Sequence, residues 1–102
     1  MLELIYITTK TKKEAKKIAK ILVKEKLAAC CNVFPIESIY RWRGKIENAK
    51  EFGMFVKTKK NLVEKIIKRA KDLHSYDIPC IISLPIRNSN KDFLKWIKRE
   101  TK

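Results

Sequence analysis

The fold is decided by the stretch Tyr40-Arg41-Trp42-Arg43-Gly44-Lys45-Ile46-Glu47. A strand-like run from Ala28 to Trp42 leads into it, a second run from Lys45 to Lys57 leads out of it, and Gly44 marks the reversal. At about 3.3 Å per residue, each arm of this hairpin would reach roughly 40–50 Å. A domain of about 100 residues has a radius of gyration of only about 13 Å. The hairpin therefore overruns its own core, and we expect its far end to cover another subunit.

The residues before the hairpin predict a strand and an amphipathic helix. Leu2 to Thr9 is rich in residues that favour β structure. Thr11-Lys12-Lys13-Glu14 then has the S/T-x-x-E spacing of a capping box. The helix that it opens runs to about Lys26, and its apolar stripe consists of Ala15, Ile18, Ala19, Leu22 and Val23.

The residues after the hairpin predict a helix, a strand and a short final helix. The second helix begins near Lys59, and its apolar stripe ends at Leu73. Cys80 to Ile86 has the composition of a buried strand, and Asn90 can cap the final helix. The order β-α-β-β-α-β is that of a split βαβ, ferredoxin-like unit. We therefore expect one α+β domain over residues 1–102.

Two residues interrupt the arms of the hairpin. Pro35 lies inside the first arm, where its missing N–H predicts an edge strand or a bulge. Gly53 lies inside the second arm and also predicts a bulge. Two helices on one face of the sheet would leave the other face bare, and an apolar bare face needs a partner.

Composition and charge restrict the class of protein. The chain is 45% hydrophobic, and no apolar run approaches the ~20 residues of a membrane span. It starts in strand-like sequence, and its three cysteines fit reduced thiols, so we expect a cytoplasmic protein without a membrane partner. The net charge of +14 would attract polyanions. However, glutamine is absent and Lys, Glu and Ile are abundant, a bias of proteins from hot environments, so we expect a solvated charged surface and high thermal stability.

The motifs of common enzyme classes are absent. The chain has neither G-x-x-x-x-G-K-[ST] nor G-x-G-x-x-G, and its two isolated glycines cannot build a phosphate-binding loop. The one histidine, His74, stands beside Ser75 and Asp77. Adjacency in sequence does not give the geometry of a nucleophile, base and orienting group. We therefore expect no enzymatic activity.

Soft metal ligands are few. Cys30, Cys31, Cys80 and His74 are the candidates, and a thiolate and imidazole set would suit Cu(I) or Zn. Cys30 and Cys31 are neighbours on a strand, so their side chains point to opposite faces and cannot chelate one ion together. The alternative is structural: the cysteines are small core residues, and the histidine is a polar residue at a helix C-terminus.

An RNA-binding domain is a further alternative, because RNA-recognition motifs share the β-α-β-β-α-β order. Ile5-Tyr6-Ile7 and Phe52-Gly53-Met54-Phe55-Val56 partly match their two aromatic strand motifs. However, Glu51 stands where the second motif has glycine, and Phe55 is out of register by one. We therefore expect no nucleic-acid partner.

Several segments together carry a family resemblance. The most specific are Leu27-Ala28-Ala29-Cys30-Cys31-Asn32 and the hairpin tip Tyr40 to Glu47. Further matches are Val56-Lys57-Thr58, His74-Ser75-Tyr76-Asp77-Ile78-Pro79, Leu84-Pro85-Ile86 and Phe93-Leu94-Lys95-Trp96-Ile97. In this collinear set the chain resembles the CutA divalent-cation tolerance family. The resemblance implies a ferredoxin-like fold, a cytoplasmic homotrimer similar in architecture to the PII signalling proteins, and a link to tolerance of copper and other divalent cations.

The resemblance also implies site residues. His74 matches the family histidine implicated in copper binding, and Cys30 matches the family cysteine before x-N. Thr8 replaces a cysteine that some bacterial members carry, Ser75 replaces the usual proline after the histidine, and Phe93 stands where tyrosine is common. We expect these departures to leave the trimer intact and to weaken copper binding.

Three hypotheses follow. The first is a trimeric metal-tolerance protein that binds copper or another divalent or soft cation weakly, and the residues expected to hold the metal are His74, Cys30 and Cys80. Its expected subunit-interface residues are Tyr40, Trp42 and Trp96. The second is a PII-like ligand-sensing module with an inter-subunit cleft near His74 and Tyr76. The third is the RNA-binding domain.

Overall fold

A four-stranded antiparallel sheet forms the frame of the protein. The computed structural model describes all 102 residues. The strands are β1 (Leu2–Thr9), β2 (Cys30–Trp42), β3 (Lys45–Lys59) and β4 (Ile81–Ile86), and they lie in the order β2-β3-β1-β4. With the helices between them, this arrangement confirms the predicted ferredoxin-like α+β fold.

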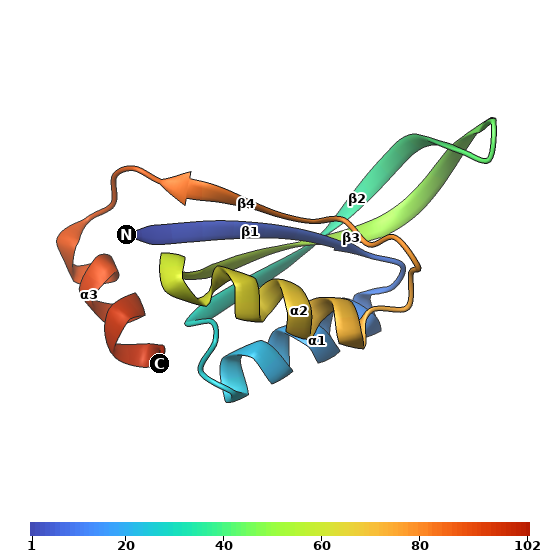
Figure 1. The fold of residues 1–102 in the computed structure, drawn as a ribbon. Coiled ribbons are helices and arrows are strands. Elements are labelled where there is room, and N and C mark those ends of the chain that lie inside the picture. Colours follow the sequence, from blue (N-terminus) through green and yellow to red (C-terminus); the bar gives the residue numbers. More distant parts are fainter.

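Two helices cover one face of this sheet, and a helix covers the other only at its end, where Leu2 packs against Ile97 (Figure 1). They are α1 (Lys12–Lys24) and α2 (Val63–Leu73), the latter preceded by a 3₁₀ turn at Lys60–Leu62. The final helix, α3 (Lys91–Glu100), lies at the end of the sheet where β1 begins. No helix is long and apolar enough to cross a membrane.

The core lies between the sheet and the first two helices, where apolar side chains of the strands meet the apolar stripes of α1 and α2. Its fully buried side chains come from alternate positions of two central strands and from the helical stripes: Ile5, Ile7, Met54, Val56, Ile18, Leu22, Ile66 and Ala70. Full burial of such an aliphatic side chain contributes about 1.5–3 kcal/mol. A smaller cluster around Leu2, Ala29 and Ile97 attaches α3 to the end of the sheet.

The hairpin of β2 and β3 closes through a two-residue loop. Arg43 and Gly44 have φ values of 51° and 78°, and a type I′ turn requires positive φ at both positions. The strands pair continuously from Cys30 opposite Lys57 to Trp42 opposite Lys45. The outer half projects beyond the helices (Figure 1), and the molecule measures 45 Å along its long axis against 25 and 21 Å across it. The prediction that the hairpin overruns the core is confirmed.

The predicted bulges do not form. Phe34 pairs with Gly53 and Pro35 pairs with Phe52 without a break in register. Because β2 is an edge strand, the edge position predicted for Pro35 is confirmed. Gly53 serves a different purpose: a Cβ atom there would lie 2.6 Å from Cε2 of Phe34 and 3.2 Å from Cε1 of Tyr6. The glycine therefore makes room for aromatic rings.

The first helix is capped as predicted, but its glutamate acts elsewhere. The N–H of Glu14 donates to Oγ1 of Thr11 at 3.1 Å. The carboxylate does not return to Thr11; it accepts from the N–H of Lys10 at 3.3 Å and from the N–H and Oγ of Ser75 at 2.7 and 3.0 Å. Glu14 thus fastens the start of α1 to the α2–β4 connection. Asn90 occupies the N-cap position of α3, but its side chain makes no capping bond.

The charges do not form an ion-pair network within the subunit. The guanidinium of Arg69 donates twice to Glu25, linking α2 to the end of α1. The outer face of α1 carries unpaired, exposed lysines: Lys12, Lys13, Lys16, Lys17, Lys20 and Lys24. High thermal stability stays a prediction, and we expect it to come from the core and from assembly.

Replacing Gly53 with alanine is expected to destabilise the fold by about 1–3 kcal/mol, because the new methyl group overpacks the ring of Phe34. Urea unfolding at fixed protein concentration measures the loss. The double variant Gly53→Ala/Phe34→Leu should lose less than the sum of the two single variants. Strictly additive losses would show that the ring does not determine the need for glycine.

Replacing Glu14 with glutamine is expected to cost about 1 kcal/mol at neutral pH. Burial raises the pKa of this carboxyl group, but the hydrogen bonds from Ser75 and Lys10 and the nearby His74 outweigh it, so the pKa falls below its ordinary 4.5. Its stabilising contribution is therefore present above about pH 4.5 and is lost as the pH falls through the lower folded value. Urea titrations at several pH values check this. The matched control is Glu64→Gln, in the first turn of α2, which should change stability little at any pH.

Candidate functional site

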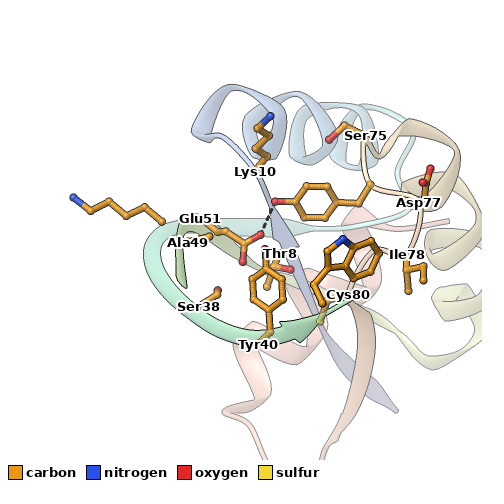
Figure 2. A pocket seen from close by; sticks show the side chains of 13 residues that line it. Thr8, Lys10, Ser38, Tyr40, Ala49, Glu51, Ser75, Asp77, Ile78 and Cys80 are labelled. Atoms are coloured by element: carbon orange, nitrogen blue, oxygen red, sulfur yellow. Dashed lines mark hydrogen bonds between the residues drawn. The ribbon is translucent and has the colours of Figure 1, made fainter. Parts of the chain in front are cut away.

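A cavity of about 720 Å³ opens on the uncovered face of the sheet. It lies between the hairpin and the connection from α2 to β4, and Figure 2 shows side chains from both segments facing it. The hairpin contributes Tyr40, Trp42 and Glu51, and the connection contributes Tyr76 and Cys80. The size is within the range of small-molecule sites.

A tyrosine–glutamate pair joins the two sides of the cavity. The hydroxyl of Tyr76 donates to Oε2 of Glu51 at 2.6 Å, shown as a dashed line in Figure 2. Burial, with the hydrogen bond to Glu51 second, raises the pKa of Tyr76 well above its ordinary value. Tyr76 therefore stays protonated and remains a donor. Glu51 itself is only 7% exposed.

Two further aromatic side chains form the hairpin wall. Tyr40 and Trp42 are alternate residues of β2, so both point to the same face of the sheet as Glu51. They are 42% and 41% exposed. Tyr40 lines the same cavity as Tyr76, together with Thr8 and Cys80. The N–H of Thr8 donates to the carbonyl of Cys80 at 3.3 Å, which joins this end of β1 to the connection.

His74 lies behind the cavity and positions its wall. The side chain is fully buried, and Nε2 lies 2.7 Å from the carbonyl oxygen of Thr8. Because a carbonyl only accepts, Nε2 carries the proton, and Nδ1 accepts from the N–H of Tyr76 at 3.1 Å. Both ring nitrogens are therefore occupied within the chain. His74 fixes the backbone of Tyr76, and the two rings lie 5.1 Å apart.

The predicted metal ligands are not brought together. Cys80 lines the cavity together with Thr8. Cys30 pairs with Lys57 of β3, which in turn pairs with Leu4 of β1. Leu4 and Thr8 are four residues apart on β1, so the two cysteines are separated by about 13 Å along the strand. No group of three His, Cys, Asp or Glu side chains could hold an ion. The set of His74, Cys30 and Cys80 therefore does not fit a single shared metal site in one subunit.

The third cysteine belongs to the core side of the sheet. Cys31 packs against the core cluster, and its Sγ lies 4.0 Å from the carbonyl of Ala19 in α1. Burial raises the pKa of its thiol to about 12. Cys31 is therefore a small, unreactive core residue, and the prediction that it and Cys30 face opposite ways is confirmed.

The predicted interface residues have different surroundings. Tyr40 and Trp42 lie on the projecting hairpin, where another subunit could reach them. Trp96 is half-buried within its own chain: it stacks on Phe93 with ring centroids 5.6 Å apart and packs against the cluster around Ile97. A role for Trp96 between subunits stays a prediction.

The uncovered face beside the cavity is apolar. We use this name for the face formed by Leu4, Tyr6, Phe34, Phe55, Ile82 and Leu84, which alternate with the core residues on their strands. The rings of Phe34 and Phe55 lie 4.8 Å apart, and those of Tyr6 and Phe55 lie 5.9 Å apart. Tyr6 and Phe55 are thus direct partners across two central strands, as the aromatics of an RNA-recognition motif would be.

The sequence reasoning missed Glu51 as a site residue and treated it only as a mismatch to an RNA motif. A signal was available. Glu51, Gly53 and Phe55 share one face of β3 by alternation, so the sequence places a carboxylate close to the aromatic residues of that face. What the sequence could not show is that the α2–β4 connection folds over this residue.

Comparisons with known proteins agree with this geometry. A family model for the CutA1 divalent ion tolerance protein matches residues 3–100. The divalent-cation tolerance protein CutA of Archaeoglobus fulgidus is 50% identical over 93 residues, which are 91% of each chain. A solved structure described as the periplasmic divalent cation tolerance protein CutA of that organism is 46% identical, covers 100% of both chains and has a TM-score of 0.98.

The chain is also similar to a plant protein. The chloroplastic protein CutA of Arabidopsis thaliana is 38% identical over 99 residues, which are 96% of this chain and 54% of the plant protein. The names of these relatives refer to two different compartments. The similarity spans nearly the whole chain, with the hairpin and the cavity included. The chain therefore belongs to the CutA1 divalent ion tolerance protein family.

Proposed function

We propose that the protein is a cytoplasmic, non-enzymatic homotrimer that contributes to tolerance of divalent cations and binds copper or another divalent or soft cation weakly. The observation that carries the proposal is the uncovered face. Phe55 is 37% exposed, and Ile82 and Leu84 are each 52% exposed, on the face opposite α1 and α2. A contiguous apolar patch of this kind is typical of a surface that meets another protein.

The two edges of the sheet support a cyclic assembly. Strands β2 and β4 are both edges, and they differ in length and sequence. An exposed edge is a template for pairing with another chain. Contact between two different edges is heterologous, and such contacts form a ring where the rotation between neighbours closes on itself. A ring of three copies, as implied by the family resemblance, would cover the uncovered face and give each hairpin a neighbour.

The metal part of the proposal rests on the accessible thiols. Cys80 lines the cavity, and Cys30 lies near the apolar face with its Sγ 4.0 Å from Oδ1 of Asn32. A single thiol without further metal ligands beside it binds a soft cation weakly, and a neighbouring subunit would have to supply the other ligands of a stronger site. The three free cysteines are consistent with a reducing compartment.

A second candidate function is the PII-like ligand-sensing module. The observation that favours it is the cavity, which combines aromatic walls with a nearly buried carboxylate. Small-molecule sites typically pair apolar and aromatic walls with a few convergent polar groups.

Light scattering after size-exclusion chromatography tests the assembly. We expect a mass three times the 12.0 kDa of one chain, and we expect Phe55→Glu to dissociate the particle because it places a charge on the buried apolar face. The matched control is Val23→Glu, at an exposed apolar position of α1, which should remain a trimer. A wild-type monomer would exclude both trimer functions. Salt-dependent RNA binding by that monomer, lost in Tyr6→Ala, would support the RNA-binding domain instead.

Calorimetric titration with copper under reducing conditions tests the metal. We expect weak binding that decreases in Cys80→Ser or Cys30→Ser and changes less in His74→Gln. The reason is that both ring nitrogens of His74 are hydrogen-bonded, and glutamine can still donate to the carbonyl of Thr8. Loss of binding in a folded His74→Gln variant would show that the imidazole is released to the metal. No binding by the wild type would overturn the metal part alone.

A further inference from the structure

Glu51 is a nearly buried carboxylate whose charge nothing in the chain neutralises. It is 7% exposed, and none of the three ion pairs of the chain includes it, so no basic nitrogen lies within 4.0 Å. Its Oε2 accepts one hydrogen bond, from Tyr76, whereas its Oε1 accepts none within the chain and keeps some contact with solvent through the cavity. A carboxylate withdrawn from water is unfavourable unless a cation or further donors reach it. Glu51 is thus prepared for a positive group from outside the chain.

The walls around this carboxylate suit an organic cation. Tyr40, Trp42 and Tyr76 line the same cavity, and no two of these rings stack on each other. Aromatic faces attract ammonium and guanidinium groups within about 6 Å of the ring centroid. The chain already shows this property, because the guanidinium of Arg43 lies 5.6 Å from the centroid of Trp42.

The remaining charges of the cavity lie at its exposed rim. Lys10, Lys50 and Asp77 are exposed, whereas Glu51 is the innermost charged group. Figure 2 shows the amine of Lys10 pointing away from Glu51. An anion attracted by the rim lysines would meet the buried carboxylate, so the cavity is unfavourable for an anionic ligand. A hard divalent cation needs six or more oxygen ligands, and the aromatic walls supply few.

We propose that this cavity binds an organic cation through an ammonium or guanidinium group, with Glu51 as its counter-ion and Tyr40 and Trp42 as its aromatic walls. The inference rests on the second candidate function, ligand sensing. Two sources can supply the group: a free small molecule, or a lysine or arginine side chain of a neighbouring subunit. At about 720 Å³ the cavity is larger than a bare ammonium ion requires, so a free ligand would carry further substituents.

Trp42 can report on the binding of a free cation. The chain has two tryptophans, Trp42 and Trp96, and a Trp96→Phe background leaves Trp42 as the fluorescent probe. The test ligands are tetramethylammonium chloride and methylguanidinium chloride, with sodium chloride at equal ionic strength as the blank. We expect a saturable change in Trp42 emission for at least one of the two.

Matched variants tie this signal to the site. Glu51→Gln keeps an acceptor for Tyr76 but removes the charge, and we expect it to weaken binding at least about tenfold. The control is Glu47→Gln, on the same strand and the same sheet face but outside the cavity, which should bind as the parent does. Trp42→Leu, followed by NMR shifts of the Tyr76 amide, should also weaken binding.

Light scattering on the same variants separates the two sources. A trimer that binds neither test cation but dissociates in Glu51→Gln, and not in Glu47→Gln, would show that a neighbouring subunit supplies the cationic group. A stable trimer that binds no cation, with Glu51→Gln unchanged in assembly, would overturn the inference and leave the assembly proposal standing. A Glu51-dependent response to copper or magnesium alone, or to an anion, would overturn the cation class while keeping the cavity as a ligand site.

Discussion

The unequal length of two paired strands is the constraint on which the rest of the structure depends. Strand β3 has 15 residues and β1 has only 8, so the outer part of β3 pairs with β2 alone. The two helices are long enough to cover the inner part of the sheet only (Figure 1). The projecting hairpin and the cavity at its base follow from this mismatch, whereas the uncovered face exists because α1 and α2 lie on the same side of the sheet (Figure 1).

The large-scale arrangement was predictable because it depends on patterns of several residues. The helical stripes and the order of helices and strands along the chain follow from the periodicity of apolar residues, and the reversal follows from Gly44, which takes the positive φ that the turn needs. Single residues were less predictable. From the sequence, Gly53 is equally compatible with a β-bulge and with a regular strand on which an aromatic ring packs closely. The position of the Phe34 ring shows that the second explanation holds. The capping box failed in the same way, because Ser75, remote in sequence, takes the glutamate.

The candidate site shows the same limit. His74, Tyr76 and Cys80 could be selected from the sequence, but the hydrogen bonds that occupy both ring nitrogens of His74 come from the backbone of Thr8 and Tyr76. Backbone partners leave no mark in the amino-acid sequence. His74, a candidate metal ligand from the sequence, therefore fixes the backbone of Tyr76 within this subunit. That tyrosine in turn donates a hydrogen bond to Glu51, the nearly buried carboxylate of the cavity.

The lysine-covered outer face of α1 has a consequence for any assembly of this chain. Each copy carries a net charge of +14, so bringing copies together concentrates like charge, and the repulsion grows with every added copy. Dissolved salt screens exposed charges over about 10 Å at 0.1 M while leaving apolar contacts largely intact. Dissolved ions would thus reduce the repulsion between subunits, and subunit association would tighten as the ionic strength rises.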